Sequence, residues 1–176
     1  MLNFRQFITE GNELQQRINK HVSNGVGVGA ISPEGAHTST PEKKKGAHEQ
    51  IRNDLESARK SGHIGGWTGP HKGQYQYGGE HEVSHEGSYI VHAAGNTDEH
   101  HKTMVGALSR IGNKHKQESV LSVDKEKNAN WHHLDASEKK GQTEYKGKLK
   151  YNVPLSQKSP GRTLMKRGSG SFTSKE

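Results

Sequence analysis

Residues 86–123, EGSYIVHAAGNTDEHHKTMVGALSRIGNKHKQESVLSV, contain the clearest structural signals in the chain. The residues from 86 to 92 predict a strand, because β-branched and aromatic residues follow a glycine. Thr97 predicts the start of a helix, since a threonine side chain caps the first turn and two acids follow it. The apolar face of this helix is formed by Met104, Val105, Leu108 and Ile111, and the helix is expected to end at Gly112. Residues 119–123 predict a second strand.

A similar order of elements precedes this stretch. Residues 26–32 alternate glycine with small apolar residues and end at Ser32, which predicts a short strand in a tightly packed place. Thr40 and Pro41 then predict a helix start, and Gly62 predicts its end. The expected apolar stripe of this helix is Ala47, Ile51, Leu55 and Ala58. Tyr75 and Tyr77 alternate as in a strand.

The resulting order is strand, helix, strand, strand, helix, strand. It predicts an α+β protein with a ferredoxin-like βαββαβ sandwich, in which two helices cover one face of an antiparallel sheet. We expect four regions in the chain. These are an amphipathic N-terminal segment (1–24), the ferredoxin-like domain (25–124), a loop with one edge strand near Leu149, Tyr151 and Val153 (125–155), and a mobile basic tail (156–176).

The composition limits what this chain can do. Its 176 residues are only 27% hydrophobic and include no cysteine, which excludes disulfides, thiolate metal sites and cysteine nucleophiles. Residues 139–176 hold ten Lys/Arg against two acids, whereas residues 1–138 hold sixteen against seventeen. The basic excess therefore lies in the C-terminal region, where weak non-specific DNA contact is expected. No apolar run approaches the ~18 residues of a membrane span, so no membrane partner is expected.

A sheet covered by helices on one face leaves its second face bare. Small domains with few large apolar residues cover such a face with another subunit or with a terminal segment. The sequence therefore favours a homo-oligomer.

The chain contains 13 histidines, and His81-Glu82-Val83-Ser84-His85 matches the H-E-x-x-H pattern of zinc peptidases. That chemistry requires a helix, and the glycines on both sides of the motif argue against one. We expect adventitious metal binding at most, by His81, His85, His92 and the pair His100-His101, and therefore no cofactor and no metal. The pair His132-His133 falls in a predicted loop, where solvated histidines are expected.

Four pieces of the chain, in order, resemble the S-adenosylmethionine-cleaving lyases of bacteriophages. They are the strand that ends at Ser32, Gly73-Gln74-Tyr75, Glu86-Gly87-Ser88 with the strand that follows, and Gln117-Glu118-Ser119-Val120-Leu121. The match covers roughly residues 26–124. The resemblance implies a ferredoxin-like trimer with its active site between subunits.

In that family the substrate's own carboxylate displaces methylthioadenosine and closes homoserine lactone, so the protein contributes mainly orientation. The resemblance implies that Glu86 anchors the cationic end of the substrate and that Tyr75 points toward it. Ser32 and Gln117 would bind substrate, with Gln117 alternatively ordering a turn. Glu82 is an alternative to Glu86 as the functional carboxylate.

The first eleven residues, MLNFRQFITEG, resemble the capsid-targeting peptide of internal head proteins in T-even-like phages. Ile8-Thr9-Glu10 before Gly11 fits the prohead protease site of those peptides. The resemblance implies that residues 1–10 bind the phage head scaffold or capsid. The expected locations are then the host cytoplasm and the interior of the virion head, with an anti-restriction role on entry. The alternative for residues 1–10 is a helix that packs on its own domain.

Two functions from different classes therefore remain open. One is a phage S-adenosylmethionine lyase. The other is a non-enzymatic virion protein or DNA-associated binding protein that uses the same fold, favoured by the N-terminal peptide and the basic tail.

Overall fold

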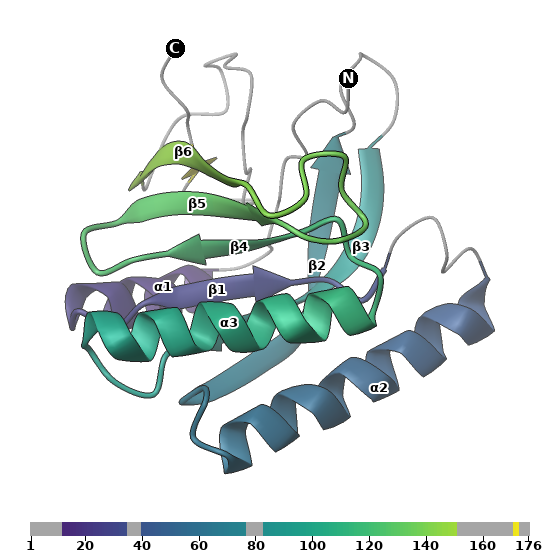
Figure 1. The fold of residues 1–176 in the computed structure, drawn as a ribbon, viewed down its shortest axis with the longest axis horizontal. Helices are drawn as coiled ribbons and strands as arrows, with labels where there is room; N and C mark the ends of the chain where they lie inside the picture. The colour runs from purple at the N-terminus through teal and green to yellow at the C-terminus, as the bar shows by residue number, and fades with distance from the viewer. Residues whose placement is uncertain (1–11, 35–39, 77–82, 151–170, 173–176) are drawn as a thin grey trace.

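The computed structural model describes residues 12–34, 40–76, 83–150 and 171–172. Within these ranges the chain is a mixed α/β protein with three helices and one antiparallel sheet. Figure 1 shows the helices packed around the sheet. The elements are α1 (Asn12–Ser23), β1 (Val28–Ile31), α2 (Pro41–Lys60), β2 (Gly66–Gln76), β3 (Val83–His92), α3 (Asp98–Lys114), β4 (Ser119–Val123), β5 (Asn128–His133), β6 (Thr143–Lys150) and β7 (Ser171–Phe172).

The sheet has the strand order β2-β3-β1-β4-β5-β6-β7, and every pair of neighbours is antiparallel. The short strand β1 lies between β3 and β4, where Gly29 stands opposite both Val91 and Ser122. Each of α2 and α3 connects two strands that are not neighbours in the sheet. The part of the sheet that carries the candidate site is therefore β2-β3-β1.

Two apolar clusters lie on the two faces of the sheet. One face is covered by α2 and α3, whose Leu55 and Leu108 pack with Ile31 and Tyr89 of the sheet. The other face packs against α1, whose Ile18 and Val22 join a cluster with the strand residues Val28, Ala30, Ile90, Leu121 and Val123. The terminal helix α1 thus covers part of the face that the sequence analysis left bare. The oligomeric state stays a prediction.

The helix starts at Thr40 and Thr97 are confirmed. Each threonine side chain accepts a hydrogen bond from a main-chain N–H three residues later, at 3.3 Å for Thr40 and 3.2 Å for Thr97. Helix α2 begins at Pro41, and Gly62 follows its end with a φ of +73°. The predicted strand at residues 119–123 is β4.

Two predictions about the bounds of the elements were wrong. Residues 125–148 were expected to be loop, but they contain β5 and the greater part of β6. Strand β5 is polar in sequence and is held by pairing to β4 and by burial of Ala129. Gly112 does not end α3, which continues to Lys114, because Gly112 is buried against Leu134 where a side chain would not fit.

Several predictions fall outside the described residues. They concern the N-terminal residues 1–11, the strand positions Tyr77, Tyr151 and Val153, and most of the basic tail. None of the described helices is both long enough and apolar enough to span a membrane.

Gly29 allows α3 to approach β1 closely, which gives a test of the packing. A Cβ at Gly29 would collide with the Leu108 side chain and lie 3.1 Å from the Leu121 carbonyl oxygen. We expect Gly29→Ala to lower the free energy of unfolding by about 1 kcal/mol, measured by urea denaturation. Gly46→Ala is the control, because nothing lies within 4 Å of its Cβ position on α2. That change should raise stability by about 0.5–1 kcal/mol, and equal effects of both changes would contradict the packing argument.

Candidate functional site

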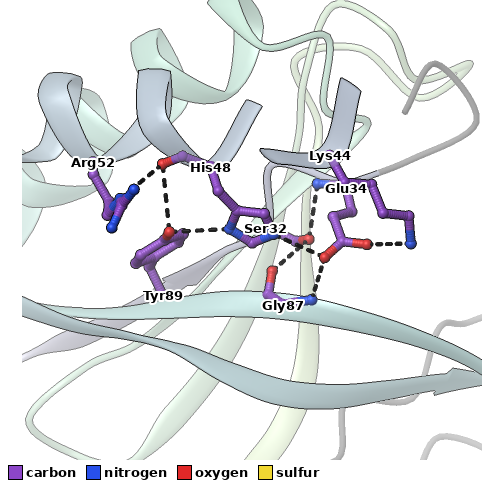
Figure 2. A network of polar contacts seen from close by, with 7 residues as sticks. All are labelled: Ser32, Glu34, Lys44, His48, Arg52, Gly87 and Tyr89. Atoms are coloured by element: carbon purple, nitrogen blue, oxygen red, sulfur yellow. Dashed lines mark hydrogen bonds and ion pairs between the residues drawn. The ribbon is translucent and has the colours of Figure 1, made fainter. Parts of the chain in front are cut away.

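The chain leaves β1 through a tight polar turn that joins it to β3. Ser32 is 7% exposed, and its Oγ donates to the Gly87 carbonyl oxygen at 3.0 Å. The same Oγ accepts from the main-chain N–H of Glu34 at 3.1 Å. Figure 2 shows these contacts at the centre of a larger network. Ser32, a predicted site residue, thus holds the backbone beside Glu86.

Glu34 is the buried acid of this network, with 6% of its surface exposed. Its Oε1 accepts from the Gly87 N–H at 2.7 Å and from His48 Nε2 at 2.9 Å, and its Oε2 forms an ion pair with Lys44 Nζ at 2.6 Å. Lys44 and His48 are four residues apart on α2, so they lie on the same side of the helix. Glu34 therefore joins the end of β1 to α2 and to β3 (Figure 2).

Burial by itself raises the pKa of a carboxyl group, but at Glu34 the donors outweigh it. Hydrogen bonds from His48, Lys44 and Gly87 lower the pKa of Glu34 to about 2. The group is therefore a carboxylate at neutral pH. Because one of its oxygens accepts two hydrogen bonds and the other is in an ion pair, it is suited to fixing the backbone rather than to taking a proton from a substrate.

His48 connects Glu34 to a buried tyrosine. Its Nδ1 lies 3.0 Å from the hydroxyl of Tyr89, which has no exposed surface. One neutral tautomer satisfies both contacts, with Nε2–H donating to Glu34 and Nδ1 accepting from Tyr89. The edge of Trp67 packs against the Tyr89 ring with centroids 5.6 Å apart, and burial raises the pKa of Tyr89. The network is thus anchored in the main core.

The two residues predicted to be catalytic lie in the β2–β3 ladder. Tyr75 stands opposite Ser84, and Glu86 stands opposite Gly73. Their backbone positions are therefore two steps apart in the same ladder, which is a diagonal neighbour relation. Glu86 directly precedes Gly87, the residue held by Ser32 and Glu34. Glu82, the alternative carboxylate, lies outside the described residues.

Gln117 occupies the turn between α3 and β4 and is 6% exposed. Its Nε2 donates to the His115 carbonyl oxygen at 3.4 Å, and its main-chain N–H donates to Gly112 at 2.9 Å. These contacts match the turn-ordering alternative that the sequence analysis left open for Gln117. They do not connect Gln117 to the network around Glu34.

The histidine motif does not form a zinc-peptidase helix at the positions that the structure describes. Val83, Ser84 and His85 lie in strand β3, where the backbone is extended. Among the described residues, no group of three or more His, Asp or Glu side chains is arranged to hold a metal ion.

The prediction that His132 and His133 are solvated loop residues was wrong. Both lie in β5, and His132 Nε2 is 2.8 Å from Ser122 Oγ while its Nδ1 is 3.2 Å from Thr143 Oγ1. Burial, together with the neighbouring His101 and His133, lowers the pKa of His132 to about 4. His133 contacts Ser137 and Glu144.

No sequence pattern singles out Glu34, Lys44 or His48. The signals available were an acid two residues after the end of a buried strand and a histidine in the first half of the next helix. Comparison with protein-family models and with curated proteins finds no match. The function is therefore inferred from these residues and their geometry.

Proposed function

We propose that this chain is a phage enzyme with a ferredoxin-like domain that cleaves S-adenosylmethionine to methylthioadenosine and homoserine lactone. The observation that carries the proposal is the β2–β3 register, which sets Tyr75 and Glu86 two steps apart beside the fixed Gly87. The strand order β2-β3-β1-β4 with crossovers through α2 and α3 supports a ferredoxin-like assignment.

The proposed reaction needs little chemistry from the protein. A carboxylate oxygen of the substrate attacks its own γ-carbon, the bond from that carbon to sulfur breaks, and its electron pair stays on sulfur as methylthioadenosine leaves. No water, metal or external base takes part. Glu86 would bind the cationic part of the substrate, and the face of Tyr75 would attract the sulfonium. Orientation of the two ends is the main contribution.

Ser32 and Glu34 contribute indirectly in this proposal. They hold the carbonyl and the N–H of Gly87, so the neighbouring Glu86 has a fixed backbone. A fixed backbone at Glu86 matters because small misplacements of the groups that orient the substrate reduce the rate steeply. We therefore assign Ser32 and Glu34 as positioning residues, and Gln117 as a residue that orders the turn before β4.

The charge distribution favours a second function, a virion protein or DNA-associated binding protein without enzymatic activity. The excess of eight positive charges in residues 139–176 suits contact with DNA phosphates. In this proposal residues 1–10 bind the phage head, and the protein resides in the head interior before it reaches the host cytoplasm. Trimer formation belongs to the enzyme proposal, because there the site lies between subunits.

Incubation of the purified full chain with S-adenosylmethionine, followed by mass spectrometry, tests the enzyme proposal. We expect methylthioadenosine and homoserine lactone, with the rate reduced about 10²–10³-fold in Glu86→Gln, the loss seen when one preorganised electrostatic contact is removed. Glu82→Gln is the matched control and should keep the rate. A folded wild-type protein without turnover would overturn the proposal, and a loss confined to Glu82→Gln would move the role to Glu82.

A further inference from the structure

A cavity of about 110 Å³ lies between α1 and the strands β2 and β3. It is on the side of the sheet where α1 packs, away from the network around Glu34. Its apolar part comes from Ile18 and Ile90, which also belong to the cluster under α1. The lining residues are Arg17, Ile18, His21, Trp67, Thr68, Ile90, Val91 and His92. Nothing described above assigns a role to this cavity.

One wall of the cavity is a stacked pair of imidazoles. The rings of His21 and His92 lie 4.2 Å apart with an angle of 14° between their planes. His92 Nδ1 lies 3.1 Å from the Ala93 carbonyl oxygen, which fixes the orientation of the ring. Its other side packs on Gly65 and Gly66, where a Cβ would fall within 2.6–2.8 Å of ring atoms. The stacked rings of His21 and His92 therefore form a rigid, flat aromatic wall of the cavity.

A cation lies beside the stacked rings, because Arg17 lines the same cavity. Burial, and the positive neighbours His92 and Lys20, lower the pKa of His21. Burial and the Arg17 guanidinium lower the pKa of His71, whose buried Nε2 has no hydrogen-bond partner among the described residues. The described ranges also contain no ion pair of Arg17. One guanidinium and two stacked imidazole rings thus line the cavity beside the apolar side chains of Ile18 and Ile90.

We infer that this cavity is a binding subsite for a planar nitrogen heterocycle, which stacks on the His21–His92 wall. The inference rests on the proposed function for the identity of that heterocycle, the adenine ring of S-adenosylmethionine. Heteroaromatic bases stack on imidazole and on guanidinium planes, and Arg17 supplies such a plane at the rim. A small anion is a poorer fit, because apart from Arg17 the lining consists mainly of flat rings and isoleucine side chains, which would not replace the hydration of an anion.

Size and location agree with this assignment. A dry cavity of about 150 Å³ holds a benzene ring, so this smaller cavity of about 110 Å³ accepts one edge of a purine and leaves the rest of the nucleoside outside. Alternate residues of a strand share one face, so positions 90, 88 and 86 of β3 belong to the same face of the sheet. Glu86 lies about 14 Å along the strand from Ile90, at about 3.4 Å per residue. The cavity and the proposed anchor for the cationic end are therefore on one face.

The test uses methylthioadenosine as the probe, because it contains the adenine ring but no cationic group for Glu86. Titration calorimetry with the full chain should detect binding of methylthioadenosine. We expect His21→Ala to weaken this binding about tenfold, the effect of removing one stacking partner from a base. Ser23→Ala is the matched control, because Ser23 is exposed on the same helix, does not line the cavity and should leave the affinity unchanged. Arg17→Ala, also exposed, serves as a second variant that leaves the apolar packing intact.

The outcomes separate this inference from the proposed lyase activity. Binding of methylthioadenosine without turnover of S-adenosylmethionine supports the subsite and overturns the enzyme. Turnover with the same methylthioadenosine affinity in wild type, His21→Ala and Arg17→Ala overturns the subsite and keeps the enzyme. A folded wild-type chain that does not bind methylthioadenosine also overturns the subsite.

Discussion

Glu34→Gln is expected to lower the free energy of unfolding by about 3 kcal/mol at pH 7. The carboxylate accepts from three donors, and an amide would turn its NH₂ group toward one of them. Removing one partner of a buried ion pair costs about 3–5 kcal/mol. We expect the lower end of that range, because the Lys44 side chain is 43% exposed and can return to water. Urea denaturation followed by circular dichroism measures the change.

Glu42→Gln is the matched control, because Glu42 is an exposed acid in the first turn of the same helix. Its loss removes only a favourable interaction with the helix dipole, about 0.3–1 kcal/mol. If the two variants lose the same stability, the contacts of Glu34 do not contribute as argued here.

The contribution of Glu34 to the free energy of unfolding is expected to depend on pH. Its pKa is about 2 in the folded protein against 4.5 in the unfolded chain, so the folded state favours the carboxylate. Its contribution is fully present above pH 4.5 and is lost as the pH falls toward 2. The difference in stability between wild type and Glu34→Gln should therefore shrink over that window.

The helices could be predicted from the sequence because their signals are local. The Thr40-Pro41 start of α2 and the Thr97 start of α3 each need only the next three residues. Strand β4 is similarly marked by an apolar run. In contrast, β5 is rich in polar residues, and it becomes a strand because β4 offers a free edge and Asp124 caps the hairpin at Asn128. Such pairing energy does not show in a residue pattern.

The candidate site was predictable only in part, for a related reason. Ser32 was named as a site residue through the resemblance to the lyases, in which it ends a recognisable strand. The contact from Glu34 to Gly87 joins residues 53 positions apart, and the contact from Glu34 to His48 crosses from a turn to a helix. These partners meet only after the sheet has formed, so no short motif contains them. The same holds for His21 and His92, which come from α1 and β3.

Acidification from pH 6.5 to 4 is expected to destabilise the protein by about 2 kcal/mol through His132. Its pKa is about 4 in the folded protein, where burial disfavours the imidazolium, against 6.5 in the unfolded chain. As the pH falls, His132 is therefore protonated in the unfolded chain before it is protonated in the folded protein. The contribution of His132 to stability is fully present above pH 6.5 and is lost as the pH falls toward 4. A shift of this size corresponds to about 3 kcal/mol, which we reduce because water reaches part of the ring.

His132→Gln should flatten this pH dependence, since glutamine can accept from Ser122 and donate to Thr143 without titrating. His63→Gln is the control, because His63 is exposed and its loss should leave the slope unchanged. Unfolding midpoints in urea measured from pH 7 to 4 provide the comparison.

The pKa of His101 is also lowered by burial, so part of the slope should persist in His132→Gln. An unchanged slope would mean that burial does not lower the pKa of His132 as expected. Because Glu34 begins to lose its contribution only below pH 4.5, the histidine effect should be resolved first as the pH falls.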